Sequence, residues 1–184
     1  MTIESDAYAK HKNLKIAAEE IGIRWQTLYC RLIKQGVKVT GDKSRYGSNR
    51  DKLAFFAENH FSRIISYAKN MNEHEWQSKY DFLCGSLRVD VKCSTPRKLN
   101  HHSDRLSWAF SFKRQNFECE LIVCFCFDEN KNIEKILAIP MEFFNGVQTI
   151  SVPIKGESKW HDYAVSENEL LTMINDLNIA LTSD

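Results

Sequence analysis

Residues 79–94, KYDFLCGSLRVDVKCS, predict a β-hairpin with one apolar face and one ionic face. Gly85-Ser86 reads as a two-residue turn of the II′ kind, which would place Cys84 opposite Leu87 and Asp81 opposite Asp90. Because side chains alternate along a strand, each face is a separate set. The predicted core face carries Tyr80, Phe82, Cys84, Leu87, Val89, Val91 and Cys93, and the opposite, solvent-facing side carries Asp81, Leu83, Arg88, Asp90, Lys92 and Ser94.

The facing pair of aspartates needs a partner that offsets its charge. Like charges directly opposite on neighbouring strands destabilise a sheet. Mg²⁺ binds one or two carboxylates and completes its shell with waters and substrate phosphate, so a divalent cation is one partner that fits. A solvated face with an Asp–Lys salt bridge, worth at most ~1 kcal/mol, is the other interpretation. Both remain open on these residues alone.

The segments around the hairpin predict a mixed α/β core. A helix is expected from Asp51 to about Asn70, with a broad apolar stripe. Strands are expected at 106–113, at 118–127 as a central strand covered on both faces, at 135–140, and at 149–154, where Pro153 indicates a sheet edge. A final helix begins at a capping box of Ser166 and Glu169.

Residues 14–35 resemble a helix-turn-helix. Two short amphipathic stretches meet at Gly22, and small Ala18 would let them approach closely. Where the motif usually has an apolar residue three positions after Leu28, this chain has Arg31 and then Leu32. The residues expected to face the major groove are Arg24, Gln26, Thr27 and Arg31. A plain helical hairpin with a charged surface is the alternative.

The charge distribution favours nucleic acid as the partner of the N-terminal part. Residues 1–52 hold 11 Lys/Arg against 6 Asp/Glu, a net +5, and residues 53–184 hold 14 against 18, a net −4. We therefore expect a helix-turn-helix region over 1–40, a linker over 41–50 and one α/β domain over 51–184.

Composition excludes several classes of protein. No apolar run approaches the ~18 residues of a membrane span, and the opening MTIESDAYAKHK lacks the apolar core of a signal peptide. The six cysteines show no C-x-x-C pair, which favours free thiols in a reducing compartment over disulfides or zinc. We expect a cytoplasmic protein with neither a membrane partner nor a small-molecule cofactor.

The hairpin residues resemble the motif of the PD-(D/E)xK nuclease superfamily. Asp81 is followed on the next strand by Asp90-Val91-Lys92, although Tyr80 stands where the family name has proline. The resemblance implies the restriction-endonuclease-like fold, a central mixed sheet flanked by helices. No helix is evident between Lys113 and Glu118, so the family's second core helix would be displaced or replaced by the C-terminal one.

The resemblance also implies a chemistry and its residues. Asp81, Asp90, the main-chain carbonyl of Val91 and Glu58 would hold Mg²⁺, or Mn²⁺ as a substitute. Lys92 would orient the attacking water and offset charge on the phosphate. Contacts to the DNA backbone would come from Ser94 and from basic residues beyond it, which are Arg97, Lys98, His101, His102, Arg105, Lys113 and Arg114.

Three functions therefore compete for this sequence. The first is a Mg²⁺-dependent DNA endonuclease, site-specific in the manner of restriction or homing enzymes and acting on double-stranded DNA as a symmetric homodimer. The second is a non-catalytic helix-turn-helix DNA-binding regulator. The third is a structure-specific repair or junction-resolving nuclease of the same fold.

Overall fold

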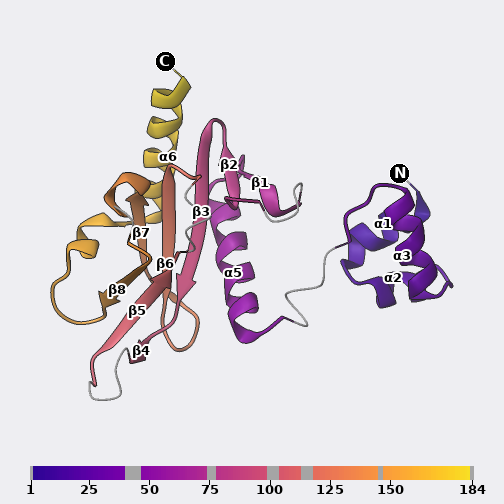
Figure 1. Ribbon diagram of the computed structural model, residues 1–184, viewed down its shortest axis with the longest axis horizontal. Coiled ribbons are helices and arrows are strands. Elements are labelled where there is room, and N and C mark those ends of the chain that lie inside the picture. The colour runs from indigo at the N-terminus through magenta and orange to yellow at the C-terminus, as the bar shows by residue number, and fades with distance from the viewer. Residues whose placement is uncertain are drawn as a thin grey trace. The chain divides into compact units, whose positions relative to one another are not determined.

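The computed structural model describes residues 2–39, 47–73, 78–98, 104–112, 118–144 and 147–182. The chain divides into two compact units, Met1–Lys52 and Leu53–Asp184 (Figure 1). Within the described residues, no helix has the length and apolar character needed to cross a membrane.

Residues 2–39 of the first unit form three short helices around a core of their own. The helices are α1 (Ile3–His11), α2 (Leu14–Glu20) and α3 (Trp25–Lys34). Gly22 has φ +72°, as expected for the turn between α2 and α3, and Ala18 is buried. The sequence pattern did not indicate α1, whose side chains show little amphipathic order. Its Ala7 and Tyr8 nevertheless complete a core with Ala17, Ala18, Leu28 and Leu32.

The second unit is built on a six-stranded mixed sheet in the order β1-β2-β3-β6-β7-β9. β2 and β3 are antiparallel, β3 and β6 are parallel, and β6 and β7 are antiparallel, which confirms the predicted mixed α/β class. The strands are β1 (Lys69–Asn70), β2 (Phe82–Cys84), β3 (Leu87–Ser94), β6 (Leu121–Phe127), β7 (Ile133–Pro140) and β9 (Ala164–Val165).

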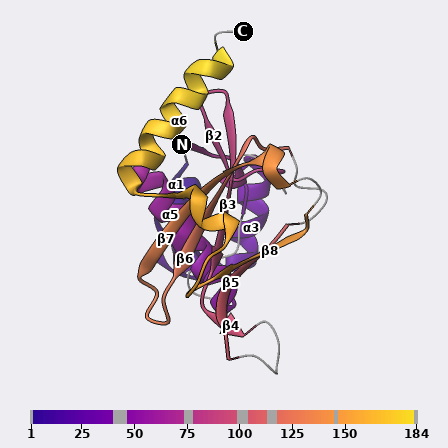
Figure 2. The ribbon, with the colours of Figure 1, turned by 90° about the vertical axis from the view of Figure 1, so that its left-hand side faces the viewer.

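Helices cover one face of this sheet and a small second sheet covers the other (Figure 2). α5 (Asn49–Ile64) and α6 (Glu167–Thr182) pack on the face that includes Val89 and Val91. The opposite face, which includes Ile122 and Cys124, packs against a three-stranded sheet of β4 (Arg97–Lys98), β5 (Leu106–Ser111) and β8 (Thr149–Pro153), and against the 3-10 segments η3 (Met141–Phe144) and η4 (Lys159–Tyr163).

Most predicted elements are confirmed, with shifted ends. All seven residues of β6 are buried, as expected of a central strand, and Pro153 lies on β8 at the edge of its sheet. The amide of Ser166 donates to Glu169 and that of Glu169 to Ser166, so the capping box forms. The helix predicted for 51–70 runs instead from Asn49 to Ile64, because the chain turns into β1 and the 3-10 segment η1 (Met71–Glu73).

The hairpin keeps its predicted register but not its predicted exposure. Leu83 pairs with Arg88 and Cys84 with Leu87, and Gly85 has φ +66°. The ionic face is only partly solvated: Asp90 is 3% exposed and Ser94 7%, whereas the side chains of Arg88 and Lys92 still reach solvent.

Two further details of the hairpin were wrong. Asp81 is not a strand partner of Asp90, because the ladder ends at the Phe82–Val89 pair. Tyr80 packs with the apolar residues under the second sheet and not with the core face that includes Phe82.

Candidate active site

Asp81 is held at the beginning of β2 by hydrogen bonds to its main chain and to both of its carboxylate oxygens. Its amide donates to the carbonyl of Val89 at 3.1 Å, and its carbonyl accepts from the amide of Met71 at 2.8 Å. The side-chain amide of Asn72 donates to Oδ1 at 2.9 Å, and the main-chain amide of Val91 donates to Oδ2 at 2.8 Å. The carboxylate of Asp81 therefore reaches across to β3 and takes the place of a missing strand partner.

Asp90 lies in the middle of β3, opposite Ile122 of β6, and its carboxyl group contacts two charged side chains. It forms an ion pair with Lys92, and the carboxyl group of Asp81 lies near enough for its negative charge to act on Asp90. Burial, together with the nearby charge of Asp81, raises the pKa of Asp90 to about 6, although the ammonium of Lys92 acts in the opposite direction. When both carboxyl groups are ionised, Lys92 offsets one of the two negative charges and the group keeps a net negative charge.

Lys92 completes the group from the same face of β3. Burial alone would lower its pKa, but the charges of Asp90 and Asp81 outweigh burial and raise it. Lys92 therefore carries a proton at neutral pH and acts as a hydrogen-bond donor and a cation, not as a base. Its side chain remains 24% exposed, so it connects the buried carboxylates to solvent.

This donor set fits a hard divalent cation. Two carboxylates in contact, one of them buried, are the oxygen ligands that Mg²⁺ takes in proteins. The amide and carbonyl of one strand residue point to the same side, so the carbonyl of Val91 faces the edge on which its amide bonds Asp81. No cluster of three or more His, Cys, Asp or Glu side chains suited to a metal occurs among the described residues, so the remaining ligands would be the main chain, water and substrate.

The structure groups Asp81, Asp90 and Lys92 through β2 and β3, whereas Glu58 comes from helix α5. Glu58 belongs to α5, whose Ala57 and Phe61 pack on the apolar face of the sheet. Asp90 and Lys92 project from the opposite face, in register with Ile122 and Cys124 of β6. Glu58 is therefore not brought to the aspartates by the strands that join the other three residues.

Sequence reasoning missed the residues that support this group. Asn72 of η1 bonds Asp81, and the amide and side chain of Arg88 both donate to Glu120 at the beginning of β6, with Nε to Oε1 at 2.8 Å. Glu118, two residues before Glu120 in the sequence, forms an ion pair with Lys79. The acid-x-acid pattern of Glu118 and Glu120 before an apolar strand was a signal that could have been read. Asn72 had none.

Three of the four predicted DNA-reading residues are available on the first unit. Arg24, Gln26 and Thr27 are exposed at the beginning of α3. Arg31 is bonded instead to Glu4 of α1, with Nη1 to Oε1 at 2.9 Å. Leu32, one helical turn after the buried Leu28, faces the core in place of residue 31.

The residues of the second unit that were predicted to contact the DNA backbone lie in environments that differ from one another. The hydroxyl of Ser94 accepts from the amide of Ala109 at 3.0 Å and donates to the carbonyl of Thr95 at 3.1 Å, so it joins β3 to β5. Arg97 and Lys98 are exposed on β4, where Lys98 contacts Asp104 at 2.6 Å. His101, His102, Lys113 and Arg114 lie outside the described residues.

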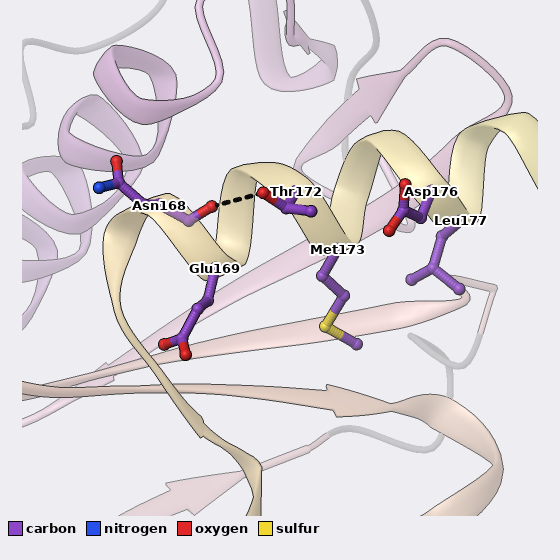
Figure 3. Close-up of a pocket in the computed structure, with 6 residues that line it drawn as sticks. All are labelled: Asn168, Glu169, Thr172, Met173, Asp176 and Leu177. Carbon is purple, nitrogen blue, oxygen red and sulfur yellow. Dashed lines mark hydrogen bonds between the residues drawn. The ribbon is translucent and has the colours of Figure 1, made fainter.

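A hollow of about 480 Å³ lies along α6 and is separate from this group (Figure 3). It is lined by Asn168, Glu169, Thr172, Met173, Asp176 and Leu177, all from one helix. Thr172 donates its hydroxyl to the carbonyl of Asn168 at 3.0 Å. None of the residues grouped around Asp90 lines it.

Comparison with known proteins yields similarity to solved structures but not to sequence families. No family model matches the sequence, and no curated protein matches it. Among solved structures, a bacterial homing endonuclease, I-Ssp6803I, is similar with a TM-score of 0.48 and 13% sequence identity, over 72% of this chain and 98% of that one.

Proposed function

We propose that the protein is a Mg²⁺-dependent DNA endonuclease of the PD-(D/E)xK type, with a restriction-endonuclease-like core. The observation that carries the proposal is the grouping of three charged side chains at one place on β3: the carboxylate of Asp81 bonds the amide of Val91, and Asp90 and Lys92 on either side of Val91 form an ion pair. Burial of the Asp90 carboxylate costs stability, and Lys92 offsets only one of the two negative charges, so a bound cation gives a reason for this grouping that a purely structural role does not. Perturbed ionisable groups of this kind cluster at functional sites.

Asp81, Asp90 and the carbonyl of Val91 would hold the ion. When bound there, Mg²⁺ would act as a Lewis acid toward a phosphodiester and would lower the pKa of a coordinated water, so that hydroxide becomes available near neutral pH. The protonated Lys92 donates hydrogen bonds toward the attacking water and offsets the negative charge that grows on the phosphate. The water oxygen forms a bond to phosphorus while the bond from phosphorus to the leaving oxygen breaks.

The first unit would bring the duplex to this site. Its net charge of +5 supplies salt-dependent affinity for phosphates. Arg24, Gln26 and Thr27, exposed at the beginning of α3, would contact base edges in the major groove and select a site in the manner of a restriction or homing enzyme. Arg97 and Lys98 would contact the backbone nearer the cut.

Nicking of a random-sequence plasmid library tests the activity. We expect the wild type to nick in Mg²⁺ or Mn²⁺ and not in EDTA, and Lys92→Ala to slow nicking by about 10²-fold or more. Lys131→Ala, which removes an exposed ammonium from the β6–β7 turn, is the matched control and should retain the wild-type rate. Wild-type protein that binds the library well and never nicks it would end the proposal. Flap and four-way-junction substrates in the same assay separate a structure-specific nuclease from a site-specific one.

A non-catalytic DNA-binding regulator is the second candidate. The observation in its favour is that the helix-turn-helix unit forms a complete core of its own. Calorimetric titration of Mg²⁺ into wild type and Asp90→Ala separates the two functions. Binding heat that is lost in the variant supports the nuclease, and equal, negligible heats support the regulator.

A further inference from the structure

We infer that Asn72 is a positioning residue that fixes the orientation of the Asp81 carboxylate for metal binding, an inference that rests on the nuclease function proposed above. Asn72 lies in η1, between β1 and β2, and its Nδ2 donates to Oδ1 of Asp81 at 2.9 Å. A carboxylate can only accept, so the amide must present its NH₂ group to Asp81.

The two oxygens of Asp81 are held from two directions. The main-chain amide of Val91 donates to Oδ2 at 2.8 Å from β3, and Asn72 donates to Oδ1 from the other side of the hairpin. The Val91 bond alone would leave the carboxylate free to rotate about its terminal torsion, which is broad for Asp. The Asn72 bond removes that freedom and sets which lone pairs face Asp90.

Asn72 is itself held firmly enough to do this. The amide of Met71 donates to the carbonyl of Asp81 at 2.8 Å, and the amide of Asn72 donates to Oδ1 of Asn70 at 3.0 Å. Met71 is buried, which anchors the segment to the core. The segment is therefore connected to Asp81 through both main chain and side chain, the arrangement expected of a residue that supports a metal ligand.

The chain contains a matched control for this contact. In the β6–β7 turn, Nδ2 of Asn132 donates to Oδ2 of Asp128 at 2.8 Å. The bond has the same donor, the same acceptor and nearly the same length, but it lies on an exposed turn. Asn132→Ala therefore removes an Asn–Asp hydrogen bond without affecting the carboxylate pair.

The experiment compares full-length wild type, Asn72→Ala, Asn72→Leu and Asn132→Ala. Mn²⁺ binding is measured by calorimetry without DNA, and plasmid nicking is measured across a Mg²⁺ series. We expect both Asn72 variants to bind Mn²⁺ about 10-fold or more weakly and to need correspondingly more Mg²⁺ for half-maximal nicking. At saturating Mg²⁺ they should regain most of the rate, because the reacting groups are still present. Asn132→Ala should match the wild type.

Each outcome has a distinct meaning. Asn72 variants with wild-type Mn²⁺ affinity and Mg²⁺ dependence overturn this inference and leave the nuclease function intact. A wild type that neither binds the ion nor nicks DNA overturns the nuclease function, and the inference with it. Leucine has the same branching and the same number of side-chain heavy atoms as asparagine but cannot donate a hydrogen bond, so Asn72→Leu carries the test if near-ultraviolet circular dichroism shows that Asn72→Ala folds poorly.

Discussion

Among the individual residues, Asp90 combines burial with a second carboxyl group in contact, and both raise its pKa to about 6. A carboxyl group whose pKa is higher in the folded state than in the unfolded state contributes its stability below the unfolded value of about 4. That contribution is lost as the pH rises through about 6. Wild-type protein therefore bears, at neutral pH, the cost of an ionised group with little contact with water.

Asp90→Asn should relieve this cost. We expect the free energy of unfolding to be about 1–3 kcal/mol higher in the variant at pH 7, and the gain to shrink between pH 6 and pH 4. Urea unfolding across this pH range measures both. Asp104→Asn, which changes a fully exposed aspartate, serves as the control and should show little pH-dependent difference. A variant less stable than wild type at pH 7 would show that the ion pair with Lys92 outweighs the burial cost.

Individual site residues were predictable from sequence to different degrees. Asp81, Asp90 and Lys92 followed from a glycine turn and the two-residue alternation of strands, which are local rules. The burial of Asp90 was not predictable, because β5 and β8, which cover its face of the sheet, come from distant parts of the chain. Asn72 was not predictable either, because its role depends on one contact with a residue nine positions later.

At the scale of elements, the hairpin turn is fixed against the last helix. The amide of Ser86 donates to Oδ1 of Asn178 on α6 at 2.8 Å. A Cβ on Gly85 would come within 2.3 Å of the same side-chain oxygen, and Gly85 has a positive φ. The turn therefore needs glycine for two independent reasons, one conformational and one steric.

Gly85→Ala should lower the free energy of unfolding by about 2–4 kcal/mol, as the sum of backbone strain and the clash with Asn178. Gly85→Ala/Asn178→Ala should recover the steric part, so a double-mutant cycle measured by urea unfolding separates the two terms. A cycle with no coupling would contradict the close approach of the turn to α6.

The outer face of α3 offers a chemical probe of DNA binding. Cys30 is exposed there, one turn after Gln26 and one turn before Lys34. In contrast, burial raises the pKa of the Cys84, Cys119 and Cys126 thiols to about 12. A maleimide should therefore modify Cys30 preferentially. We expect duplex DNA to slow this reaction at least 10-fold and the modified protein to bind DNA weakly, with Cys30→Ser as the unreactive control. Equal labelling rates with and without DNA would place the contact surface elsewhere.

Elements were predictable where one pattern decides them. The unbroken apolar run at 121–127 indicated a central strand, and the capping box indicated where α6 begins. The alternation at 106–112 predicted an apolar face, of which Trp108, Phe110 and Phe112 are buried, but Leu106 is exposed and Ser107 and Ala109 of the other face are buried as well. It did not show which sheet the strand joins. The second sheet depends on pairing of β5 with β4 and β8, which no local pattern determines.

For the whole molecule, cleavage of both strands of a duplex by one active site per chain requires two chains, so we predict a symmetric homodimer. Addition of inactive Asp90→Asn protein to wild type should form mixed dimers that cut one strand only. Supercoiled plasmid carrying a cleaved site should then accumulate as nicked circles as the fraction of variant rises, which gel electrophoresis measures. A constant ratio of linear to nicked product would indicate that each chain acts alone. Arg24→Ala, which lacks one proposed base contact but keeps the active site, is the control and should keep that ratio.

β3 alternates between two environments, with Val89 and Val91 under the helices and Arg88, Asp90 and Lys92 toward the second sheet. A saturation-mutagenesis map of residues 87–93 should therefore separate into two interleaved phenotypes. Substitutions at odd positions would reduce the yield of folded protein, while those at 90 and 92 would leave abundant, inactive protein. Within this seven-residue segment, alternate positions would therefore report on folding and on catalysis, with a period of two.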